Sequence, residues 1–371
     1  MELKKNNPLV KWIVKSKFLG ILFFAIIGVI AVLKLGQALI ENPPLFLSQV
    51  VNGLQLGFVY ALIALGYTMI YGIVRLINFA HGDVFMVGAF SSYFAIARFN
   101  LHLWFVNLFP DIPIFIGQII GTITVVIFSM IICAVMAFTI ERIAYKPLRN
   151  APRISALITA IGISFFLEYF SALKFVFSAN YITYERPFDV KTWFIGSGGF
   201  GMIDTGVAPP KGSIVFSNIF IIIVIASILL LFLLQFIVQR TKIGKAMRAV
   251  AYDKPTAQLM GINVDAVIST TFALGAALAG AAGVLYSIAF SQVFFFMGII
   301  PGLKAFVAAV LGGIGSIPGA FIGALIMGQA ETLAAAYIST PMRDAIAFSI
   351  LIIVLLVRPK GILGEITSEK V

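Results

Sequence analysis

Long apolar segments separated by short polar connections make up most of this 371-residue chain. A helix that crosses a lipid bilayer needs roughly 20 consecutive apolar residues, and six of the segments meet that length with almost no charged residue. The six segments are Leu19–Ile40, Leu47–Tyr71, Ile114–Ile140, Ile154–Phe177, Ser217–Val238 and Ala266–Phe290. We therefore predict an all-α fold, a polytopic bundle of transmembrane helices.

Four further apolar segments are shorter or are interrupted by glycine and proline. They are Val84–Ala97, Val293–Leu311, Ile317–Tyr337 and Ala345–Val357. Counting these four together with the six long segments gives ten crossings. The total is eight if two of the shorter segments are re-entrant. Irregular backbone at membrane depth is tolerated only where protein or a water-filled cavity surrounds it, so the interrupted segments predict discontinuous helices beside a pathway.

The positive charges gather at the ends of the apolar segments. The clusters are Lys4, Lys5, Lys11, Lys15 and Lys17; then Arg142, Lys146, Arg149 and Arg153; then Arg240, Lys242, Lys245, Arg248 and Lys254; and finally Arg358 and Lys360. With an even number of crossings and a cytoplasmic N-terminus, every cluster falls on the cytoplasmic side, as the positive-inside rule requires. We therefore predict a multi-pass protein of a cytoplasmic membrane, with both termini in the cytoplasm.

The composition agrees with a membrane protein and excludes several other classes. Hydrophobic residues make up 61% of the chain, charged residues 11%, and the mean hydropathy is +1.06. The net charge of +11 comes from clusters at segment ends, which does not indicate nucleic-acid binding. The single cysteine, Cys133, lies in an apolar segment and excludes a disulfide or cysteine-based metal site within the chain.

We expect one membrane domain over residues 19–364, between a basic cytoplasmic segment, residues 1–18, and a short tail, residues 365–371. The longest external connection, residues 178–216, contains several glycines and the pair Pro209-Pro210. A segment of that length without disulfides or metals rarely builds its own core. We therefore expect an ordered or partly ordered external loop rather than a separate domain.

Polar and ionisable residues interrupt the apolar pattern between Arg75 and Asp83. Ionisable groups at bilayer depth usually face the interior of a bundle or water, and they mark function. Two interpretations stay open for Asn78, His81, Gly82 and Asp83. They cap the helix that follows, or they line a substrate pathway in which the free N–H groups of a helix start attract an anionic group.

A second interruption begins at Pro301. The seven apolar residues 305–311 lie between Pro301-Gly302 and a glycine-rich stretch, and seven helical residues cannot cross a bilayer. The pattern predicts a half-helix beside a turn and adds to the candidate pathway Gly302, Lys304, Gly312, Gly313 and Gly315. The alternative is that these glycines only permit close helix packing, as the spacings Gly53/Gly57 and Gly319/Gly323 do.

The connection over residues 240–265 contains a short helix that is specified at both ends. Asp253 is a good N-cap, Pro255 is tolerated in a first turn, and Gly261 is a natural stop. So short a helix is unstable alone, and its apolar residues predict docking against another protein. The alternative is a basic loop on anionic headgroups. The candidate docking residues are Asp253, Lys254, Pro255, Thr256, Ala257, Leu259, Met260 and Gly261.

The chain has no motif for catalysis. The phosphate-binding pattern G-x-x-x-x-G-K-[ST] is absent, and the two histidines, His81 and His102, are not part of H-E-x-x-H. We expect neither enzyme activity nor a cofactor or metal in this chain. Because it lacks a phosphate-binding motif, any ATP that drives transport would bind, with Mg²⁺, to a separate subunit. Two carboxylates, Glu168 and Glu331, lie inside apolar segments. We expect Glu331 to pair with a basic group or to line the path, and the alternative for both is a purely structural partner.

Several motifs together resemble the permeases of bacterial branched-chain amino-acid ABC importers, specifically the first of their two permease subunits. The motifs are Asn52–Gly66, Arg75–Asp83, Met86–Ala89, Ala144–Arg149, Leu157–Gly162, Gly244–Asn263, Gly302–Gly319 and Arg358–Gly361. The resemblance covers roughly residues 47–364. The N-terminal segment and the loop over residues 178–216 are the parts that least resemble the family.

The resemblance implies a heteromeric importer in a bacterial cytoplasmic membrane. Its other members would be a second homologous permease, cytoplasmic ATP-binding subunits and an extracytoplasmic solute-binding protein. The short helix 253–261 would be the coupling helix that docks on the ATP-binding subunit, and the substrate would be Leu, Ile or Val. Urea, short amides or other amino acids stay open as substrates, and a stand-alone channel or secondary transporter is the alternative from another class.

Overall fold

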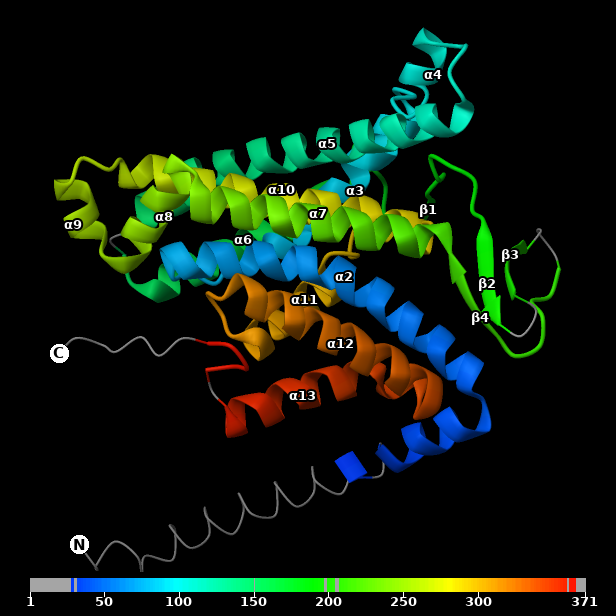
Figure 1. Cartoon of the computed structure of the whole chain (residues 1–371). Helices are drawn as coiled ribbons and strands as arrows, with labels where there is room; N and C mark the ends of the chain where they lie inside the picture. The colour runs from blue at the N-terminus through cyan, green and yellow to red at the C-terminus, as the bar shows by residue number, and fades with distance from the viewer. Residues whose placement is uncertain are drawn as a thin grey trace, which may run out of the picture.

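The computed structural model describes residues 28, 29, 32–149, 151–196, 199–203, 207–358 and 360–364. The chain forms a bundle of long helices with a small sheet at one end and two short helices at the other (Figure 1). We call these the sheet end and the α9 end. The predicted all-α, polytopic bundle is confirmed for the membrane domain.

The helices are α2 Pro43–Val74, α3 His81–Ala97, α4 Trp104–Leu108, α5 Ile114–Ile140, α6 Arg153–Ser171, α7 Asn218–Arg240, α8 Lys242–Tyr252, α9 Lys254–Leu259, α10 Val264–Phe290, α11 Ile299–Gly312, α12 Ile317–Tyr337 and α13 Arg343–Val357. A π-helical turn, Glu141–Tyr145, and a 3₁₀ turn, Lys146–Leu148, extend α5, and a second 3₁₀ turn, Thr340–Met342, precedes α13. The strands are β1 Ile182–Thr183, β2 Thr192–Gly196, β3 Gly199–Ile203, β4 Ser213–Ser217 and β5 Gln292–Val293.

Seven stretches of helix among the described residues are long and apolar enough to cross a membrane. They are the ones built on α2, α5, α6, α7, α10, α12 and α13. Five of the six predicted long segments correspond to α2, α5, α6, α7 and α10, although α6 ends at Ser171 rather than at Phe177. Residues 19–27, 30 and 31 of the first predicted segment, Leu19–Ile40, lie outside the described residues, and the other residues of this segment are helical.

Two apolar helices are shorter than these seven stretches, each of which has at least 18 residues. α3 has 17 residues and α11 has 14. Each follows an unwound segment, residues 75–80 before α3 and residues 291–298 before α11. The predicted discontinuous helices are therefore present among the described residues.

The two broken regions belong to two similar units of opposite direction. In one unit α2, an unwound segment, α3 and α5 follow one another, and in the other α10, an unwound segment, α11 and α12 do so. In Figure 1 α2 runs toward the α9 end, whereas α10 runs away from it. The short helices α3 and α11 consequently start near the middle of the bundle and leave it in opposite directions, as in transporters built from inverted repeats.

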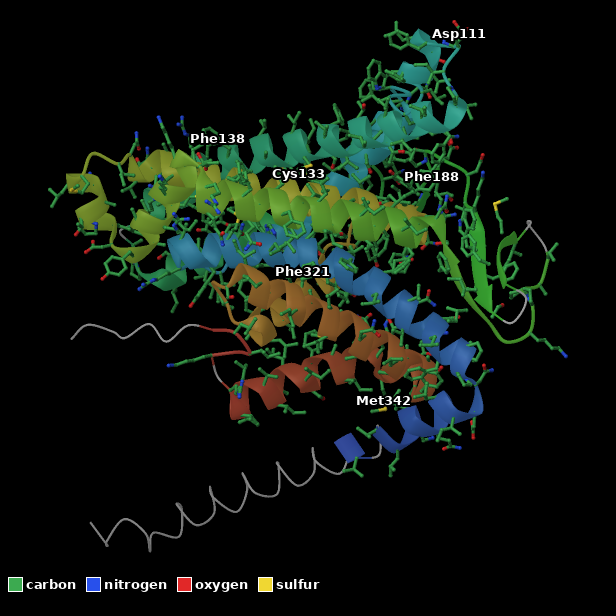
Figure 2. All side chains as sticks on the ribbon, viewed as in Figure 1. Asp111, Cys133, Phe138, Phe188, Phe321 and Met342 are labelled. Atoms are coloured by element: carbon green, nitrogen blue, oxygen red, sulfur yellow. The ribbon has the colours of Figure 1, made fainter. Side chains whose placement is uncertain are left out.

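Small residues let the central helices approach closely. A Cβ atom on Gly88 of α3 would lie 2.6 Å from the Cα of Gly280 on α10. Ser129 of α5 donates its hydroxyl to the carbonyl oxygens of Gly88 at 2.8 Å and Gly280 at 3.2 Å, so three helices meet there. Cys133, one turn further along α5, is buried in the same contact (Figure 2). Small residues therefore hold α3, α5 and α10 together by close packing, as is typical of helix interfaces in membranes.

The predicted glycine spacings pack two other helix pairs. A Cβ atom on Gly57 of α2 would lie 2.9 Å from the Cα of Leu325 on α12, and one on Gly319 would lie 2.5 Å from the carbonyl oxygen of Gly312 on α11. Phe321, seen between α2 and α12 in Figure 2, meets the ring of Phe58 edge-on at 5.6 Å. The packing interpretation of Gly53/Gly57 and Gly319/Gly323 is confirmed.

The loop over residues 178–216 contains strands that the sequence did not predict. β2 pairs with β3 and β4 to form an antiparallel sheet, in which Trp193 stacks on Phe200 at 5.2 Å. β1 pairs with β5, whose two residues belong to the unwound segment before α11. The described parts of the loop are therefore paired in strands, and its first strand is held to the outer part of the α10–α11 break.

We predict that Gly88→Ala destabilises the protein by about 1–3 kcal/mol, because the added Cβ collides with backbone rather than with a movable side chain. Gly162→Ala on α6 is the matched control, since a Cβ there meets nothing within 4 Å. Thermal unfolding in detergent can be measured as the loss of the monodisperse size-exclusion peak with temperature. The midpoint of this loss should be lower for Gly88→Ala only. Equal midpoints for the two variants would contradict the packing described here.

Candidate functional site

The starts of α3 and α11 meet near the centre of the bundle. A Cβ atom on Gly82 would lie 2.6 Å from the carbonyl oxygen of Gly298, and one on Gly302 would lie 2.7 Å from the Cα of Gly82. Only glycine fits at these positions, because any side chain would enter the facing backbone. Two helix N-termini, each with a partial positive charge, thus converge inside the bundle. Their first turns are largely hydrogen-bonded already, because the N–H groups of His81, Asp83 and Gly302 donate to the carbonyl oxygens of Asn78, Ala80 and Gly298.

The predicted residues of the first motif surround this meeting point. Asn78, 5% exposed, accepts hydrogen bonds from the Tyr145 hydroxyl at 2.7 Å and from the N–H of Ala80 at 3.2 Å. The ring of His81 lies 4.6 Å from that of Tyr67. Asp83 accepts a hydrogen bond from the Ser164 hydroxyl of α6.

The capping interpretation of this motif is therefore wrong for Asp83. The side chain lies in the first turn of α3 but turns outward to Ser164, and the N-cap position of α3, Ala80, has no side-chain cap. Asn78 is the residue of this motif whose side chain accepts from a backbone N–H near the helix start. Tertiary contact with α6 outweighs the local preference of Asp for capping.

The second motif folds differently from the prediction. α11 does not begin after Pro301-Gly302 but at Ile299, because proline is tolerated in a first helical turn, so the half-helix has 14 residues rather than seven. Gly313 and Gly315 have φ values of 109° and 99° and form the turn after it. Gly302 therefore lies at the centre of the bundle, whereas Gly312, Gly313 and Gly315 lie at the far end of α11.

Lys304 is part of a buried ion network. Its ammonium group lies 2.8 Å from Glu331 Oε1 and 2.6 Å from Asp344 Oδ1, and the Lys304 side chain is 1% exposed. Tyr60 donates its hydroxyl to Glu331 Oε2 at 3.0 Å, and Arg343 Nε lies 3.1 Å from Glu331 Oε1. The network joins α2, α11, α12 and α13, and it confirms the expectation that Glu331 pairs with a basic group.

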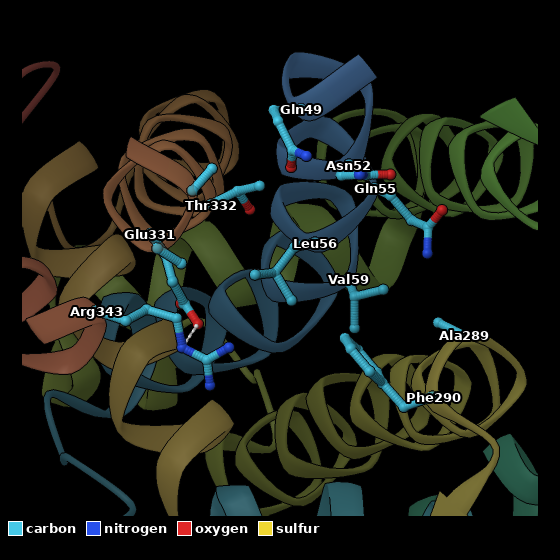
Figure 3. Close-up of a pocket in the computed structure, with 12 residues that line it drawn as sticks. Gln49, Asn52, Gln55, Leu56, Val59, Ala289, Phe290, Glu331, Thr332 and Arg343 are labelled. Atoms are coloured by element: carbon cyan, nitrogen blue, oxygen red, sulfur yellow. Dashed lines mark ion pairs between the residues drawn. The ribbon is translucent and has the colours of Figure 1, made fainter. Parts of the chain in front are cut away.

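A cavity of about 410 Å³ opens beside this network, toward the sheet end. Figure 3 shows Glu331 and Arg343 on one side of it and residues of α2 and α10 around the remainder. The lining residues are Gln49, Asn52, Gln55, Leu56, Val59, Ala289, Phe290, Glu331, Thr332, Ala335, Ala336 and Arg343. We call it the outer cavity.

Most of these residues were missed by the sequence analysis. Gln49, Asn52 and Gln55 recur every third position inside an apolar segment, a spacing that places polar side chains on neighbouring parts of one helix face. That periodicity was an available signal. Arg343 carried no such signal, because a charge just before an apolar segment is ordinarily a boundary residue.

A second cavity, of about 790 Å³, lies at the α9 end beneath the α2–α3 break. Arg75, Lys254 and Tyr145 line it, together with an ion network in which Arg149 pairs with both Glu141 and Asp265. Lys146 adds a further ion pair with Asp265 at 2.9 Å. The basic residues of the predicted cytoplasmic connections therefore gather at one end of the bundle.

The short helix α9 has the predicted ends. Asp253 is its N-cap and accepts hydrogen bonds from the N–H and the hydroxyl of Thr256 at 3.0 and 2.9 Å, which hold the pKa of Asp253 below its ordinary value. Pro255 lies in the first turn, and Gly261 follows the helix with a φ of 80°. Burial, reinforced by Arg149 and Arg75, lowers the pKa of Lys254.

The apolar surface of α9 differs in one residue from the prediction. Leu259 and Met260 are 88% and 78% exposed, whereas Ala257 is 4% exposed and faces the bundle. The adjacent Tyr252 is 79% exposed. The apolar surface that α9 presents is therefore formed by Tyr252, Leu259 and Met260, with Ala257 as the anchor of the helix.

No metal site is evident in the part of the chain that the structure describes, since no three His, Cys, Asp or Glu residues are grouped to hold an ion. Glu168, the other predicted buried carboxylate, is 1% exposed on α6, one turn from Ser164. Within the described ranges, Glu168 forms no ion pair.

Comparison with known proteins agrees with these features. Residues 49–355 match the family described as "Branched-chain amino acid transport system / permease component". The high-affinity branched-chain amino acid transport system permease protein LivH of Salmonella typhimurium is 41% identical over 326 residues, which cover 88% of this chain and 98% of LivH. LivH of Escherichia coli K12 is 41% identical over 329 residues, with the same coverage.

A third relative has a different name and the same described role. The high-affinity branched-chain amino acid transport system permease protein BraD of Pseudomonas aeruginosa is 39% identical over 327 residues, again covering 88% of this chain and 98% of the relative. Matches of this length include both helix breaks, the buried ion network and α9. The chain therefore belongs to the family of permease components of branched-chain amino acid transport systems.

Proposed function

We propose that this chain is one permease subunit of an ATP-driven importer that carries leucine, isoleucine and valine across the cytoplasmic membrane. The observation that carries the proposal is the meeting of α3 and α11 at Gly82, Gly298 and Gly302, in a chain whose relatives are named for this transport. A protein that only spans the membrane has no need of two broken helices at its centre, because unwound backbone there is costly.

The chemistry of the central region suits an amphiphilic substrate. Two helix N-termini provide positive potential toward a carboxylate. Aromatic rings border the region on its α9 side, where Phe306 lies 5.7 Å from the ring of Tyr67 and 6.1 Å from that of Phe79. An aliphatic amino acid needs a polar surface for its charged groups and an apolar surface for its side chain, whereas urea or a short amide needs only the polar surface.

Energy for transport would come from another polypeptide. The exposed residues Tyr252, Leu259 and Met260 project from the α9 end, and isolated apolar side chains of this size at the tip of a short capped helix suit insertion into a groove. We therefore propose that α9 docks on a cytoplasmic ATP-binding subunit, which would hold ATP and Mg²⁺. A second homologous permease and an extracytoplasmic solute-binding protein complete the proposed importer.

The proposed orientation places the α9 end in the cytoplasm. Arg149, Lys254 and Arg358 lie at that end, and the sheet lies at the other (Figure 1). Since basic connections stay on the cytoplasmic side, the sheet end would face outward and both chain termini inward.

We predict that Leu259→Glu weakens binding of the ATP-binding subunit about 30-fold and lowers leucine uptake in proportion. The substitution replaces an apolar hot-spot contact by a charge that would have to be buried in the groove, a loss of about 2 kcal/mol. Val207→Glu, an exposed apolar residue of the sheet-end loop, is the control. Co-purification and uptake by the reconstituted complex measure the two effects. Ala257 is avoided because its burial makes a substitution disturb α9 itself. Undiminished co-purification of Leu259→Glu would count against docking.

The orientation gives a separate prediction. Cys133 is fully buried, so added cysteines can be labelled selectively with an impermeant maleimide. Phe200→Cys should react in intact cells, whereas Lys245→Cys, exposed on α8 and outside the proposed docking residues, should react only after permeabilisation. The opposite pattern would reverse the proposed topology.

A further inference from the structure

We propose that the outer cavity binds the substrate amino acid before it reaches the central helix break, with the guanidinium of Arg343 holding the α-carboxylate. This inference rests on the proposed function, since it assigns a place to the substrate of that importer.

Arg343 is held on one edge and free on the other. Its Nε lies 3.1 Å from Glu331 Oε1, and no hydrogen bond within the described ranges involves its two terminal nitrogens. The side chain is 45% exposed and lies at the cavity wall, as Figure 3 shows. A carboxylate can therefore meet the free edge of the guanidinium with two parallel hydrogen bonds, the geometry in which arginine binds carboxylates best.

Glu331 fixes the direction of that edge. The Glu331 side chain is 2% exposed and is itself held by Lys304 at 2.8 Å and by the Tyr60 hydroxyl at 3.0 Å. An acceptor anchored in this way orients the guanidinium before any ligand arrives, which reduces the ordering that binding would otherwise require. Arg343 therefore differs from a mobile surface arginine.

The charge balance of the network favours a zwitterion over an anion. Two cations, Lys304 and Arg343, face two carboxylates, Glu331 and Asp344, so the network is neutral. A bound anion would leave this partly buried group with a net negative charge, which is unfavourable at low dielectric. An amino acid brings its own ammonium and keeps the total at zero.

The other walls match the rest of an amino acid. Gln49, Asn52 and Gln55 of α2 carry amide oxygens that can accept from an ammonium group, and Leu56 and Phe290 provide an apolar surface for an aliphatic side chain. A cavity of about 410 Å³ is within the size range of small-molecule sites. Polar groups for both charged ends and an apolar wall therefore lie in one space.

The position of the cavity agrees with an entry site. It lies among the first turns of α2 and the last turns of α10 and α12, at the sheet end. The unwound segment over residues 291–298 leads from that end of α10 to the start of α11 at the centre. A substrate in the outer cavity would lie just outside the helix break through which it must pass.

The test is leucine binding to the complex of permeases and ATP-binding subunits in nanodiscs, without the solute-binding protein, by isothermal titration calorimetry. We expect Arg343→Gln to weaken leucine binding by about tenfold or more and Arg343→Lys to have an intermediate effect, because lysine keeps the charge but not the two-pronged geometry. Lys174→Gln removes an exposed cation elsewhere on the chain and should bind leucine as the wild type does.

Two leucine analogues separate the parts of the site. Isopentylamine lacks the carboxylate and 4-methylpentanoate lacks the ammonium, so each should bind the wild type about tenfold or more weakly than leucine. Isopentylamine should also lose no further affinity in Arg343→Gln. Unchanged leucine binding by Arg343→Gln, equal binding of isopentylamine and leucine, or no leucine binding by the wild type would overturn the site.

The proposed function is measured separately, as leucine uptake into proteoliposomes by the complete wild-type importer with its solute-binding protein. If the wild-type importer takes up leucine but Arg343→Gln binds leucine as the wild type does, the binding site in the outer cavity is overturned and the proposed transport function stands. Absence of uptake by the wild type overturns the function itself. Size-exclusion chromatography of Arg343→Gln and Arg343→Lys confirms that both variants remain folded.

Discussion

The contact between backbone atoms at Gly82, Gly298 and Gly302 is the constraint on which the rest of the structure depends. Two helices can begin in the middle of a bilayer only if their unwound approaches are covered by protein, since lipid cannot satisfy free N–H and C=O groups. Glycine makes this possible, because the two chains approach to a distance that leaves no room for a Cβ atom. The surrounding long helices supply the cover.

Polar contacts at the sheet end and closer to the centre hold these covering helices and the external loop in place. At the sheet end, Arg186 donates to the carbonyl oxygen of Ile288 at 2.8 Å, and β1 pairs with β5, so the loop is attached to the last turn of α10 and to the segment before α11. Closer to the centre, Lys304 and Glu331 join α11 to α12. Removing one partner of such a buried pair would leave an unpaired charge, which costs far more than the pair contributes.

Both broken helices are held on more than one side. α11 is tied to the external loop before it begins and to α12 and α13 along its length. α3 is tied to α6 through Asp83 and Ser164, and to α5 and α10 at Gly88. Residues of the α2–α3 break line the same cavity as Lys254 of α9.

The sequence by itself determined the features whose causes are local. Apolar length specified the long helices, and the cap at Asp253, Pro255 in the first turn and Gly261 specified α9, because capping acts within a few residues. Only the tertiary structure decided where side chains on different helices meet. It turned Asp83 away from capping, started α11 before Pro301 and buried Ala257. It also placed Arg343 beside Gln49 and Asn52. These outcomes depend on contacts between residues far apart in the chain, and a pattern along one sequence carries no information about such distances.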